Sequence, residues 1–247
     1  MGRQRKYLLL WGLIFGLALT LSLTGYAGFF DDLELSLEKQ IGRSGYESII
    51  AEYQVVRLSP EEEERLQNIF DRLVAACGRK NELEFSLTVV EDETVNAFAL
   101  PAGYIFVHTG LLAYVENDGE LAGVLAHEIA HVDRKHSMNA IKRQLGMALL
   151  FQLFFRDAGE EMAKIGNLAL NLTQLGYGRE AEYEADRYGV FFMEKAGYSR
   201  DEILNFWRRL VEQSGGGKDP AILQLFSTHP PTAERIKKIE DLPTPAL

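Results

Sequence analysis

The sequence lacks the features that mark several large classes of protein. It has a single cysteine, Cys77, so no intrachain disulfide is possible, and residues 73–77 are typical of a buried helix end rather than of a catalytic thiol. It has no glycine-rich phosphate loop and no internal repeat. Its 36 acidic and 26 basic residues give a net charge of −10, which does not favour nucleic-acid binding. Hydrophobic residues make up 47% of the chain, enough for a packed core.

Charge is also missing from a stretch near the N-terminus. Residues 7–23 are almost entirely apolar and follow a short basic segment, which is the order found in a secretory signal. The small residues at 25–27 favour cleavage, and an uncleaved signal anchor is the alternative. We therefore expect residues 1–28 to be a signal peptide or anchor. The rest of the chain is then expected to be extracytoplasmic, with membrane attachment through residues 7–23 if the segment is retained.

The most informative pattern is His-Glu-Ile-Ala-His at residues 127–131. On a helix, His127 and His131 lie on one face, so both can bind one Zn²⁺. Glu128 lies about 100° round the helix, where its carboxylate can reach a metal-bound water. Zinc lowers the pKa of that water, and the carboxylate can take its proton as the water attacks a carbonyl group. The pattern therefore predicts metal-assisted hydrolysis, with a peptide bond as the expected substrate.

The surrounding residues predict a helix that carries this pattern. Asn117 followed by Glu120 has the spacing of a helix N-cap. Beyond it, four apolar residues are spaced as on one helix face: Leu121, Leu125, Ile129 and Val132. The two histidines and the glutamate fall on another sector. We therefore expect this helix to bury one side and to offer the other side to a cleft.

A catalytic zinc site needs a third protein ligand, with the fourth position left for water. A metzincin would have a histidine six residues after His131, but Ser137 stands there. His136 is about 140° round the helix from His131, so we expect it to pack or to form hydrogen bonds. Glu182 and Asp186 are four apart on a later helix, where one carboxylate can bind the metal and the other can accept the N–H of a ligating histidine. An exposed acidic face is the alternative.

The histidine pattern followed by Glu-x-x-Ala-Asp at 182–186 resembles the gluzincin metallopeptidases of the HtpX and CAAX-prenyl-protease type, metallopeptidase family forty-eight. Within that family, the chain looks most similar to the small periplasmic LoiP-like and BepA-like proteases. Residues 96–107 resemble the strand segment before the family's active-site helix, and residues 227–230 with Arg235 resemble its C-terminal motif. The chain departs from the family at Ala102, where glycine is common, and at Gly178, where serine is frequent.

The resemblance implies one Zn²⁺ per chain with three ligands: His127, His131 and Glu182. It implies that Glu128 is the general base and that Asp186 supports a ligand. It also implies a place near the metal for His229, which either polarises the tetrahedral intermediate or occupies the open metal position in a latent form. From its neighbours alone, His229 merely precedes two prolines in a turn. The resemblance further implies unfolded or misassembled cell-envelope proteins as substrates and a role in their quality control.

Alternating apolar residues predict strands at about residues 85–89, 95–100 and 104–109, which we expect to form a small sheet beside the active-site helix. In gluzincins the substrate backbone often lies along an edge strand, where main-chain pairing gives affinity. The candidate edge consists of Asn96, Ala97, Phe98 and Ala99. His108, on the last strand, is expected to be structural, because no carboxylate lies near it in the sequence.

Helical patterns predict further helices over 59–77, 160–176, 179–195 and 201–213, and a helical segment near 47–53. A second apolar run at 145–155 is too short to span a membrane and is expected to form a core helix. The alternatives are a flap over the site and a segment that dips into a bilayer surface. The three glycines at 215–217 predict a flexible loop.

The expected fold is α+β and mostly helical, of the gluzincin (zincin-like) metalloprotease type. An N-terminal arm at 29–58 should precede a catalytic domain at 59–247. The expected function is that of a zinc metalloendopeptidase that acts on unfolded or misassembled proteins, with membrane association if residues 7–23 are retained. A chaperone-like binding protein with a latent zinc site is the alternative.

Overall fold

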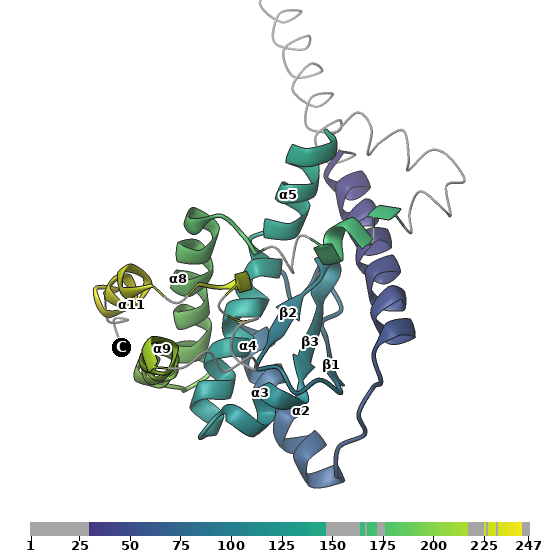
Figure 1. Ribbon diagram of the computed structural model, residues 1–247. Helices are drawn as coiled ribbons and strands as arrows, with labels where there is room; N and C mark the ends of the chain where they lie inside the picture. The colour runs from purple at the N-terminus through teal and green to yellow at the C-terminus, as the bar shows by residue number, and fades with distance from the viewer. Residues whose placement is uncertain are drawn as a thin grey trace, which may run out of the picture. The chain divides into compact units, whose positions relative to one another are not determined.

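The computed structural model describes residues 30–146, 164–165, 167–171, 176–216, 225, 227–230 and 232–243. The chain divides into two compact units, Met1–Lys39 and Gln40–Leu247. The described part of the first unit, residues 30–39, is helical. The second unit holds the sheet and the candidate site (Figure 1). The predicted signal at 1–28 and nearly all of the apolar run at 145–155 lie outside the described residues.

The second unit begins with helical residues 40–52, whereas the sequence predicted a helix only near 47–53. Ile41 and Ile49 are eight residues apart, so they share one helix face, and both are fully buried. The helix is longer than expected because this buried stripe extends over both residues.

Helix α2 (Pro60–Ala76) begins where the sequence predicts. The side chain of Ser59 accepts a hydrogen bond from the N–H of Glu62, and the Glu62 carboxylate accepts one from the N–H of Ser59. This capping box satisfies two main-chain donors at the helix start. At the other end, Cys77 is buried, and burial raises the pKa of its thiol to about 12, so it is unsuited to nucleophilic chemistry.

Three strands form a mixed sheet in the order β1-β3-β2. β1 (Ser86–Val90) runs parallel to β3 (Tyr104–His108), whereas β2 (Ala97–Ala99) runs antiparallel to β3. β2 is therefore an edge strand, as predicted. A 3₁₀ turn, η1 (Pro101–Gly103), joins β2 to β3, and Ala102 within it has a φ of 66°, a left-handed conformation that favours glycine.

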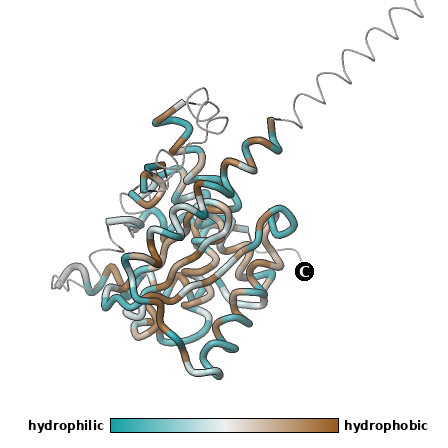
Figure 2. Tube along the Cα trace, turned by 90° about the vertical axis from the view of Figure 1, so that its right-hand side faces the viewer, coloured by the Kyte–Doolittle hydropathy of each residue, from teal (hydrophilic) through white to brown (hydrophobic). Residues whose placement is uncertain are grey.

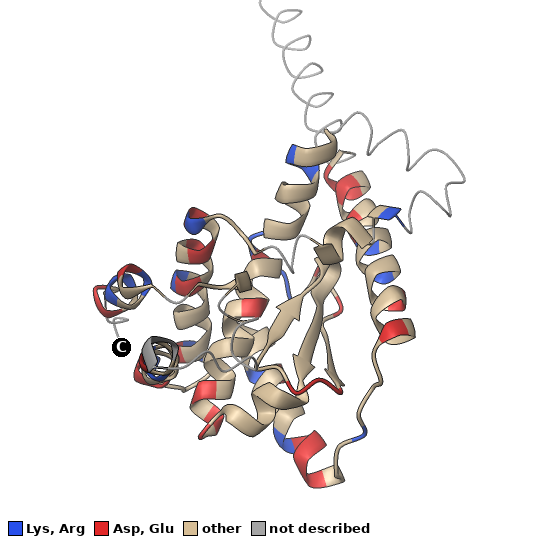
Figure 3. Cartoon of the chain, in the orientation of Figure 1, with Lys and Arg blue, Asp and Glu red and all other residues tan. Residues whose placement is uncertain are grey.

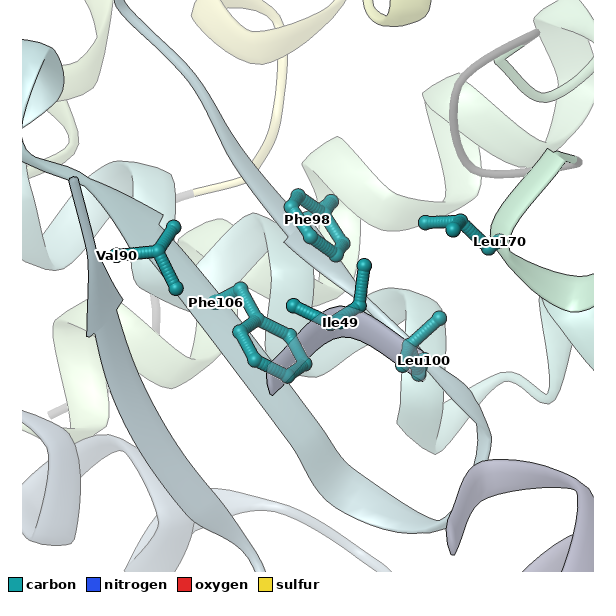
Figure 4. Packing of buried hydrophobic residues seen from close by; sticks show 6 residues of the cluster. All are labelled: Ile49, Val90, Phe98, Leu100, Phe106 and Leu170. Carbon is teal, nitrogen blue, oxygen red and sulfur yellow. The ribbon is translucent and has the colours of Figure 1, made fainter. Parts of the chain in front are cut away.

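An apolar cluster joins the sheet to the helical residues that precede it. Its buried members come from residues 40–52, from the sheet and its turn, and from residues 167–171: Ile49, Val90, Phe98, Leu100, Phe106 and Leu170 (Figure 4). Hydrophobic stretches run through the strands (Figure 2), and the strands carry no Lys, Arg, Asp or Glu (Figure 3). The sheet therefore belongs to the core and gives the neighbouring α4 a rigid support.

Helix α4 (Asp118–Asp133) lies between the sheet and α8 (Arg179–Lys195), and α9 (Arg200–Gly216) also packs on it (Figure 1). Asn117 caps α4 as predicted, because its side chain accepts a hydrogen bond from the N–H of Glu120. All residues from Gly119 to Val132 are buried. The prediction of a helix with one side open to a cleft is therefore wrong, since α2, α8, α9 and β2 surround it.

The remaining described helices are α3 (Thr109–Tyr114), α5 (His136–Leu145) and α11 (Ala233–Glu240). α8 has the bounds predicted from the sequence. α9 continues through residues 215–216, so the predicted glycine loop is wrong there, and Gly217 lies outside the described residues. Of the predicted helix at 160–176, residues 164–165 and 167–171 are helical, residue 176 is not helical, and the others lie outside the described residues. Among the described helices, none has the length and apolar character needed to cross a membrane.

Candidate metal centre

Four side chains with metal-binding atoms meet beside α4. His127 and His131 project from α4, Glu182 from the first turn of α8, and His229 from the segment before α11. One nitrogen or oxygen atom of each lies within 4.8 Å of the others, and all four residues are buried. The two helices approach closely at Gly189 of α8, where a Cβ would lie only 3.2 Å from the Cα of His127.

The spacing of these atoms fits a single tetrahedral ion. Ligand atoms that lie about 2.0–2.1 Å from Zn²⁺ stand about 3.3 Å apart at the corners of a tetrahedron. His127 Nε2 lies 3.0 Å from His131 Nε2 and 3.4 Å from Glu182 Oε2, and Glu182 Oε1 lies 3.5 Å from His131 Nε2. His229 Nδ1 lies 3.3 Å from His127 Nε2 and 3.2 Å from Glu182 Oε2. Three imidazole nitrogens and one carboxylate form a donor set that suits zinc.

Asp186 and Arg235 support the His127 side of the cluster. Asp186 Oδ1 lies 3.1 Å from His127 Nδ1, on the far side of the ring from the cluster. Arg235 donates to the two carboxylate oxygens of Asp186 at 2.8 and 2.7 Å, and its Nη1 lies 3.0 Å from Glu182 Oε2. The guanidinium also stacks on the ring of Trp207, 4.7 Å from its centroid. Arg235 therefore holds both carboxylates in place from a buried position.

His131 is held by a different group of side chains. Its Nδ1 lies 2.8 Å from Nδ1 of His136, and Nε2 of His136 lies 3.2 Å from Glu184 Oε2. The ring of Tyr177 stacks on His131 at a centroid distance of 4.2 Å, and the Tyr177 hydroxyl lies 2.6 Å from Ser137 Oγ. The predicted hydrogen-bonding role of His136 is confirmed, and its ring lies behind His131 rather than among the four clustered residues.

Glu128 faces His229 at the margin of the cluster. Its Oε1 lies 3.4 Å from His229 Nε2, and its side chain is almost completely buried. Burial raises the pKa of Glu128 above the ordinary glutamate value. A carboxylate with a raised pKa is a stronger proton acceptor when ionised, which suits a general base near neutral pH.

For two of the clustered residues, contacts with charged neighbours shift the pKa more than burial does. Burial lowers the pKa of His127, but contacts with Asp186 and Glu182 outweigh it and raise the pKa to about 9. Burial raises the pKa of Glu182, but His229 and His127 outweigh it and hold the pKa well below its ordinary value. Burial, reinforced by His127, lowers the pKa of His131. An ionised Glu182 beside a neutral His131 offers the lone pairs that a cation needs.

The strand predicted to bind substrate lies beside α4 at the edge of the sheet. Asn96 accepts a hydrogen bond from β3 through its main-chain oxygen. Because main-chain groups alternate in an antiparallel pair, Ala97 and Ala99 direct theirs away from β3. All four residues of this predicted edge are buried: Asn96, Ala97, Phe98 and Ala99. Their role in substrate binding stays a prediction.

His108 lies at the end of β3, apart from the clustered residues. Its ring is fully buried, with Nδ1 2.7 Å from Thr94 Oγ1 and 3.6 Å from Asp92 Oδ2. Burial lowers the pKa of His108, so the ring is neutral. These contacts agree with a structural role, although Asp92 supplies the carboxylate neighbour that the sequence reasoning did not expect.

Sequence reasoning missed several supports of the site, among them Arg235, Tyr177 and Gly189. Arg235 entered only through the C-terminal resemblance, because an arginine 49 residues from Asp186 gives no local signal. Gly189 stands inside a helix, and a glycine in that position is the available sign of close helix packing. Tyr177 precedes α8 and carries no pattern that distinguishes it from other tyrosines.

The four clustered residues lie within a region that matches a known protein family. The model described as peptidase family M48 matches residues 60–242, a range that includes all four clustered residues. The chain belongs to peptidase family M48. The predicted family is therefore confirmed, and so is the α+β, mostly helical gluzincin fold with its small sheet.

Several curated proteins are similar to this M48 chain. The mitochondrial metalloendopeptidase OMA1 of Schizosaccharomyces pombe is 31% identical over 216 residues, which cover 86% of this chain and 63% of that protein. A putative beta-barrel assembly-enhancing protease of Vibrio cholerae is 32% identical over 204 residues, which cover 77% of this chain and 41% of that protein. The metalloprotease YcaL of Escherichia coli is 29% identical over 151 residues, which cover 60% of this chain and 58% of that protein. The chain therefore spans less than two thirds of the length of each relative.

Proposed function

We propose that this chain is a zinc-dependent metalloendopeptidase. The observation that carries the proposal is the buried cluster of three imidazoles and one carboxylate, whose donor atoms are spaced for one tetrahedral ion. A zinc ion, when bound there, supplies a Lewis acid that polarises a carbonyl group and activates water. The names of the relatives, metalloendopeptidase and metalloprotease, support the same activity.

In the proposed reaction, Glu128 takes a proton from the attacking water and delivers it to the leaving amine. Its position beside the cluster and its raised pKa support this role. His127, His131 and Glu182 hold the metal. Asp186 orients the ring of His127 through Nδ1.

His229 has two proposed roles, which belong to different states of the site. With Nδ1 among the cluster atoms, it stands where a fourth metal ligand would stand and so closes the position that water needs. If the segment moves, its Nε2 can donate to the oxyanion of the tetrahedral intermediate. His229→Ala separates the two: a rise in kcat/KM marks a closing ligand, and a fall with unchanged zinc content marks an oxyanion donor.

We propose unfolded or misassembled cell-envelope proteins as substrates, in line with the names of the beta-barrel assembly-enhancing relatives. An extended chain that pairs with Ala97 and Ala99 would bind through its backbone, with little dependence on its sequence. The basic and apolar residues at 1–28 support a periplasmic location, either released or attached to the membrane through residues 7–23.

The test compares the 247-residue chain with its Glu128→Gln variant in mild detergent, each loaded with one equivalent of zinc, using unfolded casein as substrate. We expect kcat/KM to fall by about 10²- to 10⁴-fold in the variant while zinc is retained, because the variant removes only the proton acceptor. Zinc bound by both proteins without cleavage by either, and still without cleavage in His229→Ala, would contradict the peptidase and favour a chaperone-like protein with a latent zinc site.

A further inference from the structure

The two α4 histidines are supported by different kinds of partner. His127 Nδ1 faces a carboxylate, that of Asp186, whereas His131 Nδ1 faces the imidazole of His136 at 2.8 Å. We propose that His136 is a positioning residue that sets the tautomer of His131 and thereby its capacity to bind a metal. The inference deepens the proposed zinc site and rests on it.

The direction of the hydrogen bond follows from the placement of the His131 ring. Two imidazole Nδ1 atoms 2.8 Å apart share one hydrogen, so one ring donates and the other accepts. His131 Nε2 points into the cluster, 3.0 Å from His127 Nε2, so metal binding requires a lone pair on Nε2. A neutral His131 then carries its hydrogen on Nδ1 and donates it to His136. The opposite direction would place the hydrogen on His131 Nε2 and block the metal.

The hydrogen bonds continue outward from His136 to Glu184, whose side chain is 32% exposed. Because His136 accepts at Nδ1, its own hydrogen lies on Nε2, which is 3.2 Å from Glu184 Oε2. Arg134 donates to the other oxygen of Glu184 at 2.8 Å and so fixes the carboxylate as an acceptor. The hydrogen bonds therefore run in one direction, from His131 through His136 to Glu184.

The local backbone explains how His136 comes to lie behind His131. Lys135 has a φ of 56°, which ends the helical path of α4 and turns the chain before α5 begins at His136. The His136 ring is almost completely buried and packs against His131 and Tyr177 at centroid distances of 4.9 and 5.8 Å. A ring packed in this way has one orientation, so it can select one tautomer in its neighbour.

The first readout is the zinc affinity of the 247-residue chain, measured by competition with a chelator. His136→Phe keeps a ring but removes the acceptor, and we expect zinc affinity to fall by about 10- to 100-fold, as for the loss of a partner to a metal-ligating histidine. His136→Asn places an amide oxygen near the position of Nδ1 and should recover most of the affinity. His108→Phe removes an equally buried imidazole outside the cluster and should leave zinc affinity unchanged.

The second readout is the histidine tautomer in the metal-free chain, measured by nitrogen NMR after ¹⁵N-histidine labelling. We expect the Nδ1–H form of His131 in the wild type and a loss of this preference in His136→Phe. An Nε2–H form of His131 in the wild type would overturn the inference, as would unchanged zinc affinity in His136→Phe or an equal loss in His108→Phe. A wild-type chain that binds no zinc would instead overturn the proposed metal site, while the tautomer would still decide the role of His136.

Discussion

Replacing Arg235 by methionine should strongly destabilise the metal-free protein. The guanidinium is 3% exposed and makes two hydrogen bonds to Asp186 and an ion pair with Glu182. Removing one partner of a buried ion pair leaves uncompensated charge and costs about 3–5 kcal/mol. In a chain of this size, 1 kcal/mol lowers the Tm by about 2–4 °C, so the Tm should fall by roughly 6–20 °C.

The loss of stability caused by Arg235→Met should become smaller at acidic pH. Burial raises the pKa of Asp186, but Arg235 outweighs burial and holds the pKa below its ordinary value in the folded wild type. This contribution to stability is present above the unfolded-state pKa and is lost as the pH falls through the folded-state pKa. Without Arg235, the folded-state pKa of Asp186 moves upward, so protonation relieves the unpaired charge. The difference in unfolding free energy between the two proteins should therefore narrow from about pH 7 to about pH 4.

The assay is urea unfolding followed by circular dichroism, with a chelator present, at several pH values. The matched control is Arg208→Met on α9, because Arg208 pairs with Glu240 on the surface, where both side chains are more than 40% exposed. An exposed pair contributes less than about 1 kcal/mol, so the control should be nearly neutral. The prediction would be refuted if Arg235→Met lost no more unfolding free energy than Arg208→Met. It would also be refuted if the difference in unfolding free energy between wild type and Arg235→Met grew at acidic pH.

Three further predictions concern the sheet edge, the thiol and the turn. Ala97→Pro removes an N–H directed away from β3, so the KM for a peptide substrate should rise while the zinc content stays unchanged. An unchanged KM would show that β2 is not the strand that binds substrate. Native Cys77 should react far more slowly than the unfolded thiol with a disulfide reagent, because its pKa of about 12 leaves about one thiol in 10⁴ ionised at pH 8. Equal reaction rates for the native and the unfolded thiol would contradict the burial of Cys77. Ala102→Gly should raise the free energy of unfolding by up to about 1 kcal/mol by relieving a φ of 66°, and a lower urea midpoint would speak against that strain.

Local signals in the sequence predicted the elements that hold the candidate site. The Ser59-Pro60 start of α2, the Asn117 cap of α4 and the bounds of α8 follow from capping chemistry and helical periodicity. The i, i+4 spacing of His127 and His131 placed them on one helix face, which is a property of the helix itself.

Features that depend on tertiary packing did not follow from the sequence. The burial of α4 on all sides depends on which elements surround it, and periodicity shows only one apolar stripe. The place of His136 behind His131 depends on the left-handed Lys135, a conformation that no local pattern indicated. The convergence of Arg235 on Asp186 joins residues of different helices and required the fold.

The most direct test of the proposed zinc site is X-ray absorption at the zinc edge of the 247-residue chain, together with zinc content per chain. The account predicts one zinc with nitrogen and oxygen neighbours at about 2.0–2.1 Å, and loss of the bound zinc in a variant that lacks both His127 and His131. A chain that binds no zinc, or a zinc with a sulfur neighbour at about 2.3 Å, would contradict it.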